Sequence, residues 1–290
     1  MAAVSELRVP VALLSLSLTL ACAVRAAPGA APASRAWIPG PRGRLRVDDG
    51  GEGSGVPVVF VHGNGGNRTQ WAATLVHLRR SRRAIAFDLA GMGDSELSPG
   101  EPISVEGFAR DIEAVADAAG LSRFVLVGHS YGGAVIAAYA GMRPDRLAGL
   151  VFADSAGDLH DTPDATLEPL RRGLRDDYRG FTEKWFESIL TGARPETREA
   201  VLTSLRRTRP EVFIGATEAA YRFRLDAALA RYRGPRLSIA SWLFGNPVAI
   251  HRTTPDMPVR HMEGVSHWLM MDRPEEFDSH LDDFLAKLPR

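Results

Sequence analysis

The strongest constraint on the fold is the stretch of residues 123–139, RFVLVGHSYGGAVIAAY. Its first part is a short apolar run rich in branched side chains, which is typical of a buried strand, and its alanine-rich end is typical of a helix packed against that strand. Ser130 lies between them, flanked by Gly128 and Gly132. A serine on so sharp a strand-to-helix turn has a strained backbone, and the glycines allow the two elements to approach closely. We therefore expect the Ser130 hydroxyl to project at the carboxyl edge of a sheet, where the helix start favours a developing oxyanion.

Three further segments accompany this turn. In chain order they are residues 56–66 (VPVVFVHGNGG), residues 88–95 (DLAGMGDS) and residues 264–268 (GVSHW), with the serine turn standing before the last of them. On these four motifs the chain resembles the α/β-hydrolase family from about Arg44 to the C-terminus. The resemblance implies a doubly wound, mostly parallel sheet with an inserted helical cap. Strands that alternate with helices predict the same architecture, and we expect neither a metal nor a cofactor.

The order of the segments predicts the domain organisation. Residues 1–26 are expected to form an export signal and residues 27–41, rich in Ala, Pro and Gly, a flexible leader. The hydrolase core is expected over residues 42–155 and 232–290. Residues 156–231 lack strand signals and carry several helical segments, which the resemblance identifies as a cap over the active site.

The predicted cap contains large apolar side chains that could line an acyl pocket. The alternative is that they form the core of the cap itself, which is the commoner role of aromatic residues at helical spacing. These residues are Phe181, Trp185, Phe186, Ile189, Phe213 and Tyr221.

The N-terminal apolar run, residues 9–24, is too short for a comfortable membrane span and ends in small residues that suit signal peptidase. We expect cleavage after Ala26, an exported protein that is periplasmic or secreted, and no stable membrane span in the mature chain. A retained membrane anchor and a lipoprotein modified at Cys22 are the alternatives. Cys22 is the only cysteine, so its removal would exclude disulfides and thiolate chemistry.

The charge balance bears on the partners of the protein. The chain has 35 basic and 35 acidic residues, and no segment gathers the positive charge that a phosphate backbone requires. We therefore expect no nucleic-acid partner.

A serine hydroxyl is a poor nucleophile at neutral pH, so Ser130 needs a base and a group that orients the base. Among eight histidines, His267 is the best candidate base, because it follows the last predicted strand and precedes a proline-opened helix. The resemblance places the catalytic histidine there as well. His62 and His129 are assigned supporting roles.

An oxyanion hole is best built from backbone N–H groups, since they are fixed before the reaction begins. One is expected from Tyr131, the residue after the nucleophile, and the resemblance implies that Asn64 supplies the other.

The acid of the triad is where the chain departs from the family pattern. Most relatives carry an aspartate after the penultimate strand, but here the segment that follows holds Asn246 and no carboxylate before Asp256. Asp154 is the preferred acid, because it ends the strand after the serine helix, a position that a minority of the family uses. Asp256 is the alternative. A triad without a carboxylate is the third, since Asn246 could orient a histidine but would not stabilise an imidazolium.

The identity of the nucleophile narrows the chemistry. Dehalogenases and epoxide hydrolases of this fold need an aspartate where Ser130 stands, so acyl transfer remains. We predict a hydrolase that cleaves a small-molecule carboxylic ester through an acyl-enzyme. Hydrolysis of a C–C bond beside a ketone, or peracid formation, would use the same residues. A catalytically weak ligand-binding or sensor protein on the same scaffold is the alternative from another class.

Overall fold

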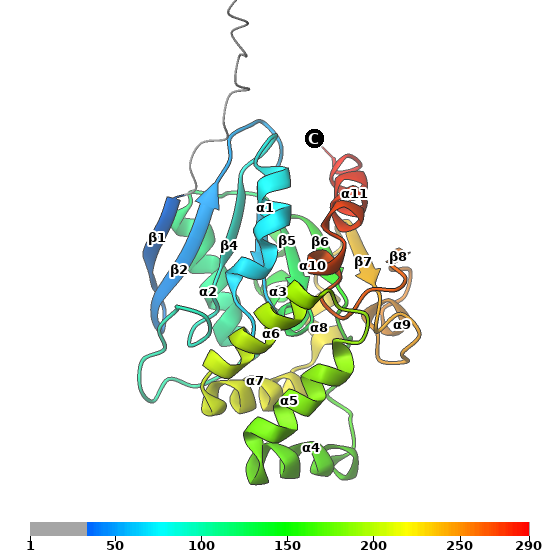
Figure 1. Cartoon of the computed structure of the whole chain (residues 1–290). Helices are drawn as coiled ribbons and strands as arrows, with labels where there is room; N and C mark the ends of the chain where they lie inside the picture. Colours follow the sequence, from blue (N-terminus) through cyan, green and yellow to red (C-terminus); the bar gives the residue numbers. More distant parts are fainter. Residues whose placement is uncertain (1–33, 290) are drawn as a thin grey trace, which may run out of the picture.

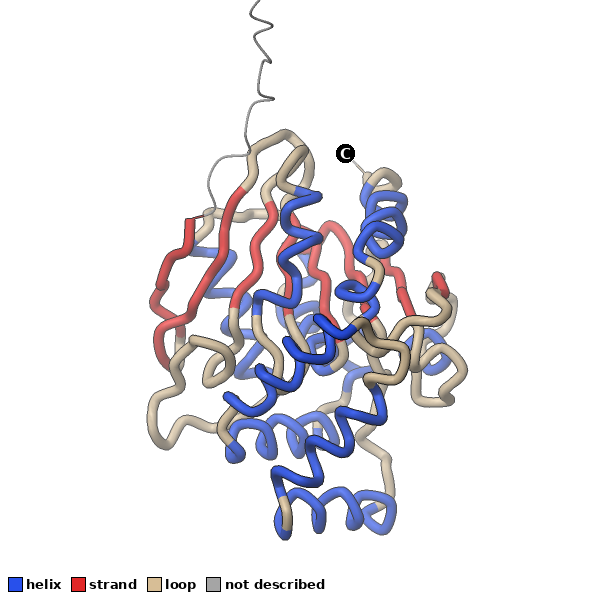
Figure 2. Tube along the Cα trace, in the orientation of Figure 1, coloured by secondary structure: helices blue, strands red, loops and turns tan. Residues whose placement is uncertain are grey.

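The computed structural model describes residues 34–289, in which a single eight-stranded sheet runs across the molecule with helices on both faces (Figures 1 and 2). The strand order is β1-β2-β4-β3-β5-β6-β7-β8. The strands β3 to β8 are parallel, whereas β1 and β2 pair antiparallel at one edge. The strand bounds are β1 Ser34–Gly40, β2 Gly43–Gly50, β3 Val58–Val61, β4 Ala84–Phe87, β5 Phe124–His129, β6 Leu147–Ala153, β7 Arg236–Ala240 and β8 Val259–His261.

The helices connect these strands in the way that parallel pairing requires. Their bounds are α1 Ala72–Leu78, α2 Val105–Ala118, α3 Tyr131–Met142, α4 Asp164–Asp176, α5 Tyr178–Ile189, α6 Pro195–Arg207, α7 Pro210–Arg222, α8 Leu225–Leu229, α9 Ile250–Thr253, α10 Leu269–Asp272 and α11 Pro274–Leu285, with short 3-10 turns η1 Arg68–Trp71 and η2 Pro144–Arg146.

The core lies on both faces of the sheet because neighbouring strand residues point to opposite sides. In β3, Val58 and Phe60 pack in the cluster that contains α1 and α11, whereas Val59 and Val61 pack in the cluster that contains α2 and α3. In Figure 1, α1 and α11 stand in front of the sheet and α2 and α3 lie behind it. All four β3 side chains are buried, which explains why the strand reads as a continuous apolar run. The predicted doubly wound, mostly parallel sheet is confirmed.

The five helices α4 to α8 lie between β6 and β7 in the chain. Figure 1 shows α4 to α7 below the carboxyl ends of the parallel strands, whereas α8 lies beside α3. In such sheets ligands bind outside the carboxyl ends of the strands. The segment predicted to be a cap therefore stands over the edge at which β5 delivers Ser130.

One boundary of the predicted leader is wrong. Residues 34–40, assigned to the flexible leader over residues 27–41, form β1 and pair with β2 in continuous antiparallel register from Ser34 to Gly40. Composition missed this strand because its order comes from pairing with β2, and from Trp37, whose ring lies under the Arg44 guanidinium at 4.9 Å. The export signal and residues 27–33 lie outside the described residues. Within residues 34–289, no helix has both the length and the hydropathy of a membrane crossing.

Candidate active site

Ser130 lies on a sharp turn between β5 and α3, with φ of 53° and ψ of −119°. Its N–H donates to the Ala153 carbonyl oxygen of β6 at 3.0 Å, which fixes the turn against the neighbouring strand. The residues that flank Ser130 at positions 128 and 132 must be glycines, because a side chain at either position would overlap with the backbone. A Cβ on Gly128 would lie 2.5 Å from the Gly132 carbonyl oxygen, and one on Gly132 would lie 2.6 Å from the Val61 carbonyl oxygen. The turn therefore forms only where both glycines stand.

His267 and Asp154 meet at this edge of the sheet. Nδ1 of His267 lies 2.8 Å from Oδ2 of Asp154, and both side chains are buried. The other carboxylate oxygen, Oδ1, accepts from the backbone N–H groups of Ser241 at 2.8 Å and Leu243 at 3.1 Å. Since a carboxylate only accepts, Nδ1 of His267 carries the proton and donates, which leaves Nε2 free to act as a base.

The two other candidates for the acid are not joined to His267 by a hydrogen bond within the described residues. Asp256 is exposed in the turn before β8 and lies outside the cavity that contains Ser130. Asn246 does line that cavity, but its Oδ1 accepts from the N–H of Val248 at 3.1 Å. Of the three candidates, the structure brings only Asp154 to the histidine. Its role in catalysis stays a prediction.

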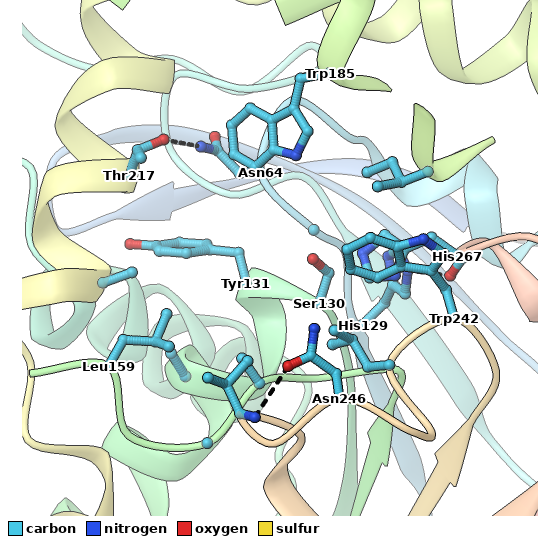
Figure 3. Close-up of a pocket in the computed structure, with 18 of the residues that line it drawn as sticks. Asn64, His129, Ser130, Tyr131, Leu159, Trp185, Thr217, Trp242, Asn246 and His267 are labelled. Carbon is cyan, nitrogen blue, oxygen red and sulfur yellow. Dashed lines mark hydrogen bonds between the residues drawn. The ribbon is translucent and has the colours of Figure 1, made fainter. Parts of the chain in front are cut away.

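The two predicted oxyanion amides belong to Asn64, in the loop after β3, and Tyr131, at the start of α3. Neither N–H donates a hydrogen bond within residues 34–289, and both residues line the same cavity as Ser130. The side chain of Asn64 is held by the cap, because its Nδ2 donates to the Phe213 carbonyl oxygen and to Oγ1 of Thr217, each at 3.0 Å. Figure 3 shows the bond to Thr217. The loop is thus positioned by helix α7.

His62 is fully buried beneath this loop. Its Nδ1 lies 2.8 Å from the Gly63 carbonyl oxygen, and its Nε2 accepts from the N–H of Leu89 at 3.0 Å. The carbonyl requires the proton on Nδ1, so both ring nitrogens are satisfied by a neutral imidazole. Burial lowers the pKa of His62, which keeps the ring in that form.

His129 supports His267 from behind. Its Nε2 donates to the His267 carbonyl oxygen at 2.8 Å, and the two rings lie 4.7 Å apart between centroids. Burial, aided by the neighbouring His267, holds the pKa of His129 well below the usual histidine value. His129 therefore stays neutral and bonds the main chain of His267. Both supporting histidines act through backbone contacts.

A cavity of about 260 Å³ opens onto Ser130 between the sheet edge and the cap. Trp185 of α5, Phe213 of α7 and Tyr221 of α7 contribute to its wall together with Phe186 and Ile189. Five of the six residues thus line the cavity, and Phe186, Ile189 and Phe213 also belong to a buried core cluster, so both roles left open by the sequence occur.

Phe181 is the exception among the predicted lining residues. It lies against Gly173 of α4, and its ring lies 6.4 Å from that of Trp185. It packs against a core cluster between α4 and α5 and does not line the cavity.

The loop between β7 and α9 lines the cavity, and its part in the wall was not predicted from the sequence. Figure 3 shows Trp242 and Asn246 of this loop beside Ser130 and His267. The indole of Trp242 packs edge-on against the imidazole of His267, with centroids 5.7 Å apart, although 44% of the residue is exposed. The position of the loop in the sequence could have indicated this role, because the loop follows β7, and the carboxyl ends of parallel strands lie at the same edge of the sheet as Ser130.

The family model for the alpha/beta hydrolase fold matches residues 56–208, just over half of the chain. A 2-hydroxy-6-oxo-2,4-heptadienoate hydrolase of Pseudomonas putida is 39% identical over 119 residues, which span 39% of this chain and 43% of that enzyme. The sn-1-specific diacylglycerol lipase ABHD11 of Mus musculus is 26% identical over 262 residues, or 79% of this chain and 80% of that protein.

The solved structures agree with these matches. A thermophilic esterase from Thermogutta terrifontis superposes with a TM-score of 0.70 and 27% identity, covering 88% of this chain and 98% of that one. The chain spans less than half the length of the Pseudomonas hydrolase that it matches. These similarities agree with the observed fold, and they leave the activity and the substrate of this chain open.

Proposed function

Because the chain belongs to the alpha/beta hydrolase fold family, we propose that it is a serine hydrolase that cleaves a neutral carboxylic ester through an acyl-enzyme on Ser130. The observation that carries the proposal is the 2.8 Å contact between His267 and Asp154 at the wall of the cavity that contains Ser130. The mouse lipase and the Thermogutta esterase, which are similar over most of their length, support ester chemistry.

In the first half of the reaction, Oγ of Ser130 attacks the ester carbonyl carbon while Nε2 of His267 takes the hydroxyl proton. Asp154 orients the imidazole and stabilises the imidazolium that forms. The carbonyl oxygen becomes an oxyanion, which the N–H groups of Asn64 and Tyr131 stabilise. His267 then returns the proton to the alcohol oxygen as the C–O bond breaks, and the acyl group remains on Ser130.

In the second half, water attacks the acyl-enzyme and His267 takes its proton. The same amides of Asn64 and Tyr131 stabilise the second tetrahedral intermediate. Collapse of this intermediate releases the carboxylic acid and returns the proton to Oγ of Ser130. Neither half needs an additional proton donor.

The proposal that the ester is neutral rests on the charge of the cavity wall. Among its lining residues in the described part of the chain, none is Asp, Glu, Lys or Arg. His129 is kept neutral by burial, and the proton that His267 carries faces Asp154. A substrate carboxylate in the cavity would lose its hydration without gaining a cationic partner, which is costly, whereas an apolar acyl chain would lose nothing.

The second candidate is hydrolysis of a C–C bond beside a ketone. The Pseudomonas relative favours it, because that enzyme is named for an oxo-dienoate. Such a substrate is a carboxylate, and among the described residues the cavity wall holds no cationic side chain to balance its charge. We therefore rank ester hydrolysis first. A comparison of an oxo-dienoate with neutral esters as substrates of the same preparation would reverse this ranking if the dienoate alone were turned over.

The experiment that tests the proposal combines turnover with active-site labelling. The parent protein should hydrolyse p-nitrophenyl esters and react rapidly with a fluorophosphonate at Ser130. Ser130→Ala and His267→Ala should each reduce turnover by several orders of magnitude, and the double variant should be no worse than either, because residues that act as one unit are non-additive. Circular dichroism checks that each variant folds. A parent that neither turns over esters nor takes the label would favour a ligand-binding or sensor protein instead.

A further inference from the structure

Asn246 presents an amide donor to the cavity from the loop between β7 and α9. Its backbone N–H donates to the Leu243 carbonyl oxygen at 2.9 Å, and its own carbonyl accepts from the N–H of Ala249 at 3.0 Å. Its Oδ1 accepts from the N–H of Val248 at 3.1 Å. The two backbone bonds fix the turn, and the bond to Oδ1 orients the side-chain amide, whose Nδ2 is turned toward Ser130 in Figure 3.

The catalytic cycle proposed above does not use this donor. Asp154 already engages His267, and the oxyanion amides belong to Asn64 and Tyr131. Within residues 34–289, Nδ2 of Asn246 donates no hydrogen bond to another residue. The Nδ2 group therefore points into a largely apolar cavity without a partner in the described part of the chain. Polar groups placed in this way commonly determine which substrates a pocket binds.

The position of the loop identifies which part of an ester Asn246 would meet. His267 returns its proton to the alcohol oxygen, so the alcohol part must lie next to its imidazole. Trp242 precedes Asn246 in the same loop and packs against that imidazole with centroids 5.7 Å apart. Asn64, which holds the carbonyl oxygen, is tied to α7 on the cap side. The loop of Asn246 thus faces the alcohol part of the substrate.

We infer that Asn246 is a specificity-determining residue whose Nδ2–H donates to a second oxygen, ether or hydroxyl, on the alcohol part of the ester. The substrate class is a neutral ester of an oxygenated alcohol. The inference rests on the proposed ester hydrolysis and adds the alcohol that the site prefers. A bound oxygen leaves no unpaired donor in the cavity, whereas a purely alkyl alcohol does.

Two isosteric substrates isolate this contact. The probes are 2-methoxyethyl butanoate and n-butyl butanoate, which differ only by an ether oxygen in place of a methylene. In Asn246→Leu the ratio of kcat/KM for the first to that for the second should fall by about 3- to 10-fold relative to the parent, as expected for one neutral hydrogen bond. Thr217→Val is the matched control, because it removes a polar group on the Asn64 side of the cavity and should leave the ratio unchanged.

Asn246→Ser separates substrate recognition from support of the loop. A serine hydroxyl can accept from the N–H two residues ahead, as Oδ1 of Asn246 does from Val248, but it is too short to present a donor near Ser130. Recognition requires the ratio in Asn246→Ser to fall as it does in Asn246→Leu. A role confined to the loop requires it to stay at the parent value, which would overturn the inference.

Two further readouts complete the test. Butyl methoxyacetate carries the ether oxygen on the acyl part, and dependence on Asn246 for this ester instead would overturn the assignment to the alcohol. Turnover of p-nitrophenyl butanoate and fluorophosphonate labelling of Ser130 in the parent report on the proposed function itself. If the parent shows turnover and labelling, and the ratio of kcat/KM values is the same in the parent and in the Asn246 variants, the inference alone is wrong. If both are absent, it is overturned together with ester hydrolysis.

Discussion

Ser130 and Asp154 both have a positive φ, which few residues other than glycine adopt, with values of 53° and 44°. Such conformations cost on the order of 1–3 kcal/mol each and persist only where the surroundings hold them. The N–H of Ser130 donates to the Ala153 carbonyl oxygen at 3.0 Å, and the N–H of Asp154 donates to the Ile239 carbonyl oxygen at 2.7 Å. Both bonds extend the pairing between parallel strands. The sheet therefore holds the two residues at the same edge.

The acid provides the prediction at the scale of the residue. Asp154→Asn keeps the shape of the side chain but lets its amide donate toward Nδ1 of His267, which favours the wrong tautomer. By analogy with other triads, we expect kcat to fall on the order of 10⁴-fold. Asp256→Asn is the matched control and should change kcat little, because Asp256 lies outside the cavity. Steady-state kinetics on a p-nitrophenyl ester decides the matter, and a large loss in the control variant would invert the ranking of the two carboxylates.

The sequence predicted the serine and the histidine more readily than the acid, for a physical reason. Ser130 and His267 each stand in a short motif beside a strand, so local pattern is enough. The choice of carboxylate depends on distant loops, since Asp154 is held by the N–H groups of Ser241 and Leu243, almost 90 residues away. No local sequence pattern indicates contacts between residues so far apart in the chain. The sequence alone therefore could not decide between Asp154 and Asp256.

Among the elements, helix α7 does more than cover the cavity. It accepts both hydrogen bonds of the Asn64 side chain, through the Phe213 carbonyl oxygen and through Oγ1 of Thr217, and Phe213 also lines the cavity wall. The loop that carries the proposed oxyanion amide of Asn64 is thus attached to α7. Stabilisation of an oxyanion by a backbone N–H depends on its being fixed before the reaction.

This attachment predicts a kinetic effect from a side chain that takes no part in the chemistry. Asn64→Ala retains the backbone N–H but frees the loop from α7, so we expect kcat to fall by about 10-fold, less than the 10²–10³-fold that removing an oxyanion donor outright costs. Thr217→Val removes one of the two bonds and should give a smaller loss. Unfolding measured by circular dichroism provides the control for stability. Unchanged kcat in Asn64→Ala would show that the loop holds its position without the cap.

The helical segments of residues 156–231 were predicted as a group, and the structure places helices α4 to α8 there. Two features were not. The strand β1 has a composition rich in Ala, Pro and Gly, and its order comes from pairing with β2. The loop of residues 241–249 lies in the cavity wall because the N–H groups of Ser241 and Leu243 donate to Asp154. This tertiary contact has no local signal in the sequence.

At the scale of the whole molecule, burial of ionisable groups couples stability to pH. Burial lowers the pKa of His62 and of His129. Below about pH 6.5 both histidines are therefore protonated in the unfolded chain while they stay neutral in the folded chain. Burial also raises the pKa of Asp111 to about 6, although it is paired with Arg42 at 3.0 Å. The carboxyl acts in the opposite sense, because between about pH 4 and 6 the folded state holds a proton that the unfolded state releases.

From pH 7.5 to 5.5 both histidines take up a proton in the unfolded chain, whereas Asp111 takes up its proton in the folded chain only near pH 6, so the free energy of unfolding should decrease as the pH falls. His129, whose folded pKa lies well below the ordinary value, contributes about 1.4 kcal/mol per pH unit between its unfolded and its folded pKa, and His62 acts in the same direction. His129→Gln tests one of them, since a glutamine amide can still donate to the His267 carbonyl oxygen but does not titrate. The decrease, measured by urea denaturation at the two pH values, should be smaller by about 1 kcal/mol in the variant than in the parent. Between pH 7.5 and 8.5, where neither buried histidine gains a proton, the difference in stability between parent and variant should stay constant. If the free energy of unfolding decreased equally in the parent and the variant below pH 7, His129 would be protonated in the folded state, and its imidazole would not be neutral beside His267.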